Sequence, residues 1–190
     1  MRRSSFSPDA QDALVEARTL TLAAGRPAIG SGALLVACAG DREGAGLLAV
    51  AGIDGRMLAR HLRLDPGNDT GAASPATLLA AIGIDLAEVR SRLPPVGTAE
   101  LELRRSRLRP LRLTLEGTGR PVPFDAQGRK VLEVATWHGR RERRPARPAD
   151  LLRGVLCDGR DPVCATLAEL AGGRLRDLFA ALFEGRRPAA

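Results

Sequence analysis

Apolar residues recur at helical spacing in the first third of the chain. The first such stretch opens with Ser7-Pro8-Asp9. Serine caps a first helical turn, proline fits its first position, and aspartate favours the positive end of the helix dipole. Small or apolar residues then follow at intervals of three and four, at Ala10, Ala13, Leu14 and Ala17. The pattern predicts a helix that starts after Ser7 and stops at Gly25.

Three shorter helices are predicted next, over residues 31–39, 43–50 and 54–62. Gly52-Ile53-Asp54 separates the last two. Glycine accepts the positive φ of a helix end, and aspartate caps the helix that follows. With 190 residues, 44% of them hydrophobic, the chain has enough apolar side chains for one domain with a sizeable core.

The middle of the chain has a different pattern. Residues 64–75 are rich in Gly, Asn, Asp and Ser and predict a loop, and residues 79–93 predict a helical hairpin that Pro94-Pro95 ends. Between Ala99 and Leu115, leucines alternate with charged or polar residues. This alternation favours a half-buried strand or a two-stranded ribbon, and an extended linker fits it nearly as well.

The later part of the chain repeats the order of the opening. Residues 6–17 align with 124–135, and residues 32–37 align with 149–154. Residues 48–52 align with 167–172, and the closing helix near residue 57 aligns with 175–178. We therefore predict an all-α fold of two pseudo-symmetric four-helix repeats, 6–63 and 121–186, in a single domain. Residues 64–120 would be an inserted helical hairpin and a basic connector.

Positive charge is concentrated in one part of the chain. The net charge is +7, and residues 97–147 hold 13 Arg and Lys against 6 Asp and Glu. Arginine clusters can neutralise phosphates, so a nucleic-acid-associated protein is one hypothesis. Its contacts would come from a second cluster at residues 140–147 and from Arg104, Arg105, Arg107, Arg109 and Arg112. Aromatic residues are only 3% and are not interleaved, which favours a solvated linker instead.

The sequence gives little support to catalysis or metal binding. Two histidines and three cysteines offer no zinc-ligand spacing, and Cys38 and Cys157 follow apolar residues as small core residues do. Ser31, Asp54 and His61 are the residue types of a hydrolase triad, but no pattern places them together. We therefore expect no enzyme activity, no metal and no cofactor.

Location follows from what the pattern lacks. The longest apolar runs are too short to cross a bilayer, and no apolar segment follows the basic start of the chain. The expectation is a cytoplasmic protein without a membrane partner.

The repeated motifs resemble a known family. Phe6 to Ala17, Ile29 to Ala37, Gly52-Ile53-Asp54 and Phe124 to Leu156 are similar to the repeat of the Clp ATPase N-terminal domain. The two copies cover roughly two thirds of the chain. The resemblance implies a docking platform for substrates and adaptors. It is that of a free-standing domain, of the kind found as small proteins in actinobacteria.

The resemblance also has limits. The only lysine, Lys130, is followed by Val131, so the chain has no phosphate-binding Gly-x4-Gly-Lys-Ser/Thr loop and cannot be the motor. Some members of the family recognise phosphoarginine through an acidic residue in each repeat. Gly32 and Ala149 stand at those two positions here, so this activity is not carried over.

The resemblance implies the following function. The protein would be a non-catalytic protein- or peptide-binding module of Clp-dependent proteolysis, acting as adaptor, as decoy, or as a sink for inhibitory cyclic peptides. Its partners would be Clp ATPase or peptidase components, or their substrates. The family's peptide contacts lie near the starts of the two long helices, which correspond here to Phe6, Pro123, Phe124 and Arg129. From the residues alone, both phenylalanines more simply anchor their helices to the core.

Overall fold

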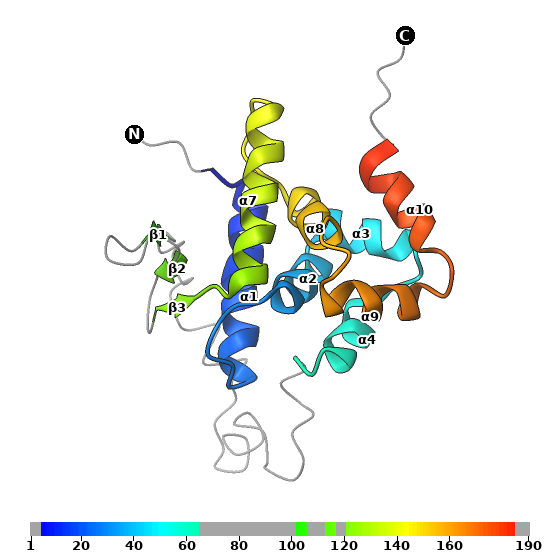
Figure 1. The fold of residues 1–190 in the computed structure, drawn as a ribbon, viewed down its shortest axis with the longest axis horizontal. Coiled ribbons are helices and arrows are strands. Elements are labelled where there is room, and N and C mark those ends of the chain that lie inside the picture. Colours follow the sequence, from blue (N-terminus) through cyan, green and yellow to red (C-terminus); the bar gives the residue numbers. More distant parts are fainter. Residues whose placement is uncertain (1–4, 65–101, 106–112, 117–120, 185–190) are drawn as a thin grey trace, which may run out of the picture.

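The computed structural model describes residues 5–64, 102–105, 113–116 and 121–184, and these are predominantly helical (Figure 1). The predicted all-α class is confirmed. The first group of helices is α1 (Pro8–Ala23), α2 (Ser31–Gly40), α3 (Arg42–Val50) and α4 (Gly55–His61). The second is α7 (Ala126–Arg141), α8 (Pro148–Leu156), α9 (Pro162–Ala171) and α10 (Leu175–Phe179), with a π-helical turn η1 (Ala180–Glu184).

Short polar side chains fix the helix starts. The hydroxyl of Ser7 accepts a hydrogen bond from the backbone N–H of Ala10 at 3.2 Å, as predicted. The Asp125 carboxylate accepts one from Gly128 N–H at 2.7 Å in the same position of α7. Asp54 was expected to cap α4, and this detail is wrong. It occupies the N-cap position of α4, but its side chain makes no capping hydrogen bond there.

The two most buried helices lie at the centre of the molecule. Residues 31–38 of α2 and all nine residues of α8 are buried, and the two helices pack against each other. Helices α1 and α7 each contact both of them. A single apolar core therefore runs through both groups of helices, which is why two short helices with few polar residues are stable in water.

Two short backbone bridges connect the groups reciprocally. Phe6, just before α1, forms a parallel bridge with Ala146, just before α8. Phe124, just before α7, forms the same bridge with Ile29, just before α2. The hydrogen bonds correspond, with Ser7 N–H donating to Ala146 at 2.8 Å and Asp125 N–H to Ile29 at 3.1 Å. The equivalence of the two groups as copies of one unit stays a prediction, and reciprocal bridges are what it leads one to expect.

Two glycines of α7 allow these bridged segments to approach the helix. A Cβ atom at Gly128 would overlap the carbonyl oxygen of Ile29, and one at Gly139 would lie 2.9 Å from the backbone nitrogen of Ala146. Each bridge therefore crosses α7 at a residue without a side chain. Because eleven residues separate the two crossings, they lie roughly 16 Å apart along the helix.

The basic connector contains antiparallel strands. Strand β1 (Glu102–Arg105) pairs with β2 (Leu113–Glu116), which pairs with β3 (Val122–Pro123). Of the predicted alternatives, the ribbon is confirmed, and β3 was not foreseen because two residues give no alternation. Leu115 is fully buried and anchors β2 to the core. The inserted helical hairpin predicted from residue 79 lies outside the described residues.

The close approach at Gly128 generates a stability prediction. We expect Gly128→Ala to lower the free energy of unfolding by about 1–3 kcal/mol, because the methyl group displaces the Ile29 bridge. Gly46→Ala is the matched control, since nothing lies within 4 Å of its added methyl group on α3. The control should raise stability by roughly 0.5–1 kcal/mol. Urea unfolding measures both, and equal effects would contradict the close-approach explanation.

Candidate functional site

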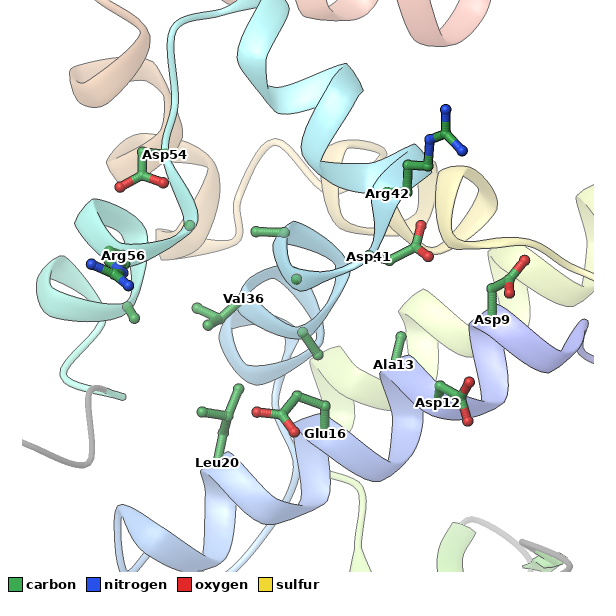
Figure 2. A pocket seen from close by; sticks show the side chains of 15 residues that line it. Asp9, Asp12, Ala13, Glu16, Leu20, Val36, Asp41, Arg42, Asp54 and Arg56 are labelled. Carbon is green, nitrogen blue, oxygen red and sulfur yellow. The ribbon is translucent and has the colours of Figure 1, made fainter. Parts of the chain in front are cut away.

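A groove opens between α1, α2 and the start of α4 (Figure 2). Its volume is about 680 Å³. Buried apolar side chains of α1 and α2 form its floor, among them Ala13, Leu20, Val36 and Ala37. Such a floor can cover small apolar side chains of a bound segment, and each buried methylene then contributes about 0.8 kcal/mol before the costs of binding.

The rim of this groove is acidic. Figure 2 shows Asp9, Asp12 and Glu16 along α1, and Asp54 on the far side at α4. Asp41, at the junction of α2 and α3, adds a fifth carboxylate, against two lining arginines, Arg42 and Arg56. The rim is thus negative on a chain whose net charge is +7. A cationic ligand with short apolar side chains complements it.

Sequence reasoning missed this groove. One signal was present, because Asp9, Asp12 and Glu16 follow one another at intervals of three and four, which puts them on one stripe of α1. The contributions of Asp41 and Asp54 depend on how α2 and α4 pack against α1. No local pattern reveals that packing.

The second group of helices does not repeat the acidic groove. Counted from the N-caps Ser7 and Asp125, Lys130 stands where α1 has Asp12, and Val134 stands where it has Glu16. The Lys130 ammonium pairs with Asp158 at 2.7 Å and ties α7 to the end of α8. The acidic character therefore belongs to one half of the fold and is not a requirement of the helix arrangement.

The predicted peptide-binding residues are placed as follows. Phe6 and Phe124 are buried, 4% and 5% exposed, so their rings mainly pack against the core. The bridges put Phe6 beside Ala146 and Phe124 beside Ile29, at opposite ends of α7, so the structure does not bring the two rings together. Arg129 is half-buried, and its Nε donates to the carbonyl of Asp125 at 3.3 Å.

Pro123 lines a different cavity, of about 700 Å³, between the end of α1 and β3. Its walls are rich in proline, with Pro27 and Pro121 beside Leu22. This cavity has one charged residue, Arg26, whose guanidinium donates to the carbonyl of Leu62 at 2.6 Å. It offers little charge with which to select a ligand.

The structure describes two of the five arginines that were predicted between residues 104 and 112 to contact nucleic acid. Arg104 and Arg105 belong to β1, where they pair with Thr114 and Leu113 of β2. Arg107, Arg109 and Arg112 lie outside the described residues.

A buried ionic network at the start of α8 is the place where a metal site would be expected. Ligand atoms of His138, Glu142 and Asp150 lie within 4.8 Å of one another. The Asp150 carboxylate, however, accepts hydrogen bonds from Arg144, Arg153 and the backbone N–H of Arg147. Arg144 also pairs with Glu142. Guanidinium groups use the oxygen lone pairs that a metal ion would need, so this donor set fits an ion-pair network better than a metal.

The network joins distant parts of the chain. Arg153 donates from Nε to the carbonyl of Leu182 at 2.9 Å and from a terminal nitrogen at 2.6 Å, so α8 is tied to η1. Burial disfavours ionisation of Asp150, but the hydrogen bonds from Arg144 and Arg147 and the two guanidinium charges outweigh it and lower its pKa. The carboxylate is therefore charged and fully bonded at neutral pH.

We expect Asp150→Asn to lower the free energy of unfolding by about 3–5 kcal/mol, because it leaves the buried Arg153 guanidinium without a carboxylate and removes one of the two carboxylates that pair with Arg144. Asp158→Asn, which removes an ion pair whose lysine is half exposed, should lower the stability far less than Asp150→Asn does. Denaturant unfolding at neutral pH compares the two. Equal losses would mean that the network adds nothing beyond a surface pair.

The same carboxylate predicts an acid dependence. A lowered pKa in the folded state means that Asp150 stabilises the fold fully above its ordinary pKa of 3.8. That stabilisation is lost as the pH falls through the lowered value. Wild-type stability should therefore fall more steeply than that of Asp150→Asn below about pH 4. Parallel slopes in thermal melts across this range would contradict the assignment.

The cysteines differ in accessibility. Cys38 is buried, as predicted, and burial raises the pKa of its thiol. Cys157 is exposed, which corrects the expectation of a core residue, and it is the first residue after the buried helix α8. Cys164 is intermediate, and burial with nearby carboxylates raises its pKa to about 11.

Alkylation of the native protein should therefore modify Cys157 first and spare Cys38. Mass spectrometry after iodoacetamide treatment locates the modified residue, and the same treatment in guanidinium chloride should modify all three. Modification of Cys38 at the rate of Cys157 would show that the core opens readily.

The three residues that have the types of a hydrolase triad, Ser31, Asp54 and His61, lie in different surroundings. Ser31 is buried at the first residue of α2, while His61 is exposed at the end of α4, with its Nδ1 3.0 Å from the carbonyl oxygen of Met57. Asp54 lies on the rim of the acidic groove.

Within the described residues, no helix is long and apolar enough to span a bilayer.

Comparisons with known proteins add little to this geometry. No family model matches the chain, and no curated protein matches it. One similar solved structure comes from preliminary structural investigations of a malarial protein secretion system. It is 11% identical, covers 96% of this chain and 100% of its own, and has a TM-score of 0.49.

Proposed function

We propose that this protein is a non-catalytic peptide-binding module, and that the groove between α1, α2 and α4 holds a cationic segment of its partner. The observation that carries the proposal is the combination of an apolar floor with a rim of five carboxylates. The floor provides burial, and the rim selects charge and speeds encounter. A mainly charged surface without a floor would give only weak, unselective attraction.

The resemblance to the Clp N-terminal repeat decides which partners to test first. They are Clp ATPase and peptidase components, or the substrates that those enzymes degrade. Three roles follow for such a peptide-binding module: adaptor, decoy, or sink for inhibitory cyclic peptides. All three require a peptide-binding surface, and the apolar floor and acidic rim of the groove support the proposal that it is one.

The peptide preference is tested directly. A fluorescent peptide of alternating lysine and alanine should bind the wild type, and a glutamate-alanine peptide should not. The double variant Asp12→Lys, Glu16→Lys reverses the α1 side of the rim and should weaken binding roughly tenfold. Glu169→Lys, exposed on α9 outside the groove, is the control and should change affinity by less than about twofold. Fluorescence anisotropy at low salt gives these affinities.

Equal binding of the acidic peptide, or an equal loss in the Glu169→Lys control, would refute the groove as the binding site. The role is separated by adding the protein to a reconstituted Clp motor and peptidase. An adaptor accelerates degradation of a model substrate, a decoy slows it, and a sink restores activity that a cyclic peptide has inhibited. No effect in any of the three assays would remove the link to Clp proteolysis and leave the peptide-binding proposal standing on its own test.

A further inference from the structure

The end of α7 presents an exposed aromatic side chain among arginines. Trp137 is 54% exposed, the most exposed large apolar side chain of the described residues. Arg140 and Arg141 follow it at positions i+3 and i+4, so all three lie on one side of the helix. The Arg141 guanidinium lies 5.3 Å from the centre of the Trp137 ring. Together with exposed Arg143 in the next loop, we name these residues the α7 platform.

The acidic groups nearest in sequence do not neutralise this platform. Glu142 pairs with Arg144, and Asp150 pairs with Arg144 and Arg153, so those four groups balance one another. Of the arginines in the predicted cluster 140–147, Arg144 is therefore bound in the ion-pair network. Arg140, Arg141 and Arg143 are exposed to solvent. Glu133, one turn before Trp137, is an exposed carboxylate on the same helix. The platform keeps an excess of positive charge.

The helix does not require these residues in order to form. Helix α1 has the same length of 16 residues and ends with no basic residue in its last turn. The positions of Trp137, Arg140 and Arg141 correspond there to Thr19, Leu22 and Ala23. Favourable interaction with the helix dipole alone therefore does not explain the arginines.

The loop that follows α7 adds a second observation. Arg143 has a φ of 55°, a left-handed conformation that glycine or asparagine adopts at lower cost. The loop nevertheless has an arginine at this position, and its side chain is exposed beside the end of α7.

We propose that the α7 platform binds single-stranded nucleic acid, with a base stacked on Trp137 and phosphates held by Arg140, Arg141 and Arg143. An indole face stacks on any unpaired base, and guanidinium groups bind phosphate oxygens through paired hydrogen bonds. This surface lies outside the acidic groove, so the proposal is independent of the peptide-binding function. It also revises the interpretation of a merely solvated cluster, because the platform brings an aromatic residue to the arginines.

The chain provides its own reporter for the test. It has one tryptophan and no tyrosine, so the emission that follows excitation of the indole absorption band comes from Trp137 itself. Titration of the full chain with oligothymidylate should quench this emission. With three phosphates neutralised, affinity should fall roughly twentyfold when salt rises from about 50 mM to 200 mM. Absence of quenching would overturn the proposal.

Variants separate stacking from charge, with labelled oligothymidylate followed by anisotropy. Trp137→Ala should weaken binding about tenfold without changing the salt dependence, and Trp137→Phe should recover part of the loss. The double variant Arg140→Glu, Arg141→Glu should lose at least about tenfold and most of the salt dependence. The matched control reverses two other exposed arginines, Arg160 and Arg176, and should retain most of the affinity. Circular dichroism verifies that each variant is folded.

Three competitors identify the ligand class. If polyphosphate competes as well as the oligonucleotide and Trp137→Ala binds normally, the platform attracts anions only and the proposal is wrong. If phosphatidylglycerol vesicles shift the emission and oligothymidylate does not, the surface faces a membrane instead. If duplex DNA binds as tightly as the single strand, stacking on Trp137 is refuted. The groove variant Asp12→Lys, Glu16→Lys should retain oligonucleotide binding, so failure of one proposal leaves the other testable.

Discussion

The reciprocal bridges between the two groups of helices are the constraint on which the rest of the structure depends. The segment before α1 takes its backbone partner from the segment before α8, and the segment before α7 takes its partner from the segment before α2. Each long helix is therefore positioned by the other half of the chain. The central pair α2 and α8 then lies between the two long helices on one side and α3, α4 and α9 on the other (Figure 1), and the groove lies where α1, α2 and α4 meet.

The sequence predicted the local elements better than their assembly. Caps such as Ser7 and the glycines at helix ends are local chemistry, and the helix bounds agree with the prediction within a few residues. The burial of Phe6 and Phe124 could also be weighed from sequence, and anchoring to the core was the simpler interpretation. Two features could not be predicted from sequence: the acidic groove, and the pairing of Arg144 with Asp150 while the neighbouring arginines stay exposed. Both depend on contacts between elements that no local pattern reveals.

The charge of the chain is divided by the fold. Carboxylates collect around the groove of the first group, while exposed arginines collect at the end of α7. The network around Asp150 pairs its own acidic and basic groups with one another. A net charge of +7 therefore describes neither surface. Two ligands of opposite charge would find different faces of the same small protein, and neither needs to displace the other.

The bridge between Phe6 and Ala146 affects how the protein folds while the ribosome synthesises it. The partner of Phe6 is synthesised 140 residues later. At ordinary rates of translation, the start of the first helix waits roughly seven to thirty seconds for its backbone partner. Helix α1 can form locally in that time, but the edge preceding it stays open to other chains. A nascent chain of this fold is thus most exposed to aggregation just before its last third emerges, and that interval is when chaperones would matter most.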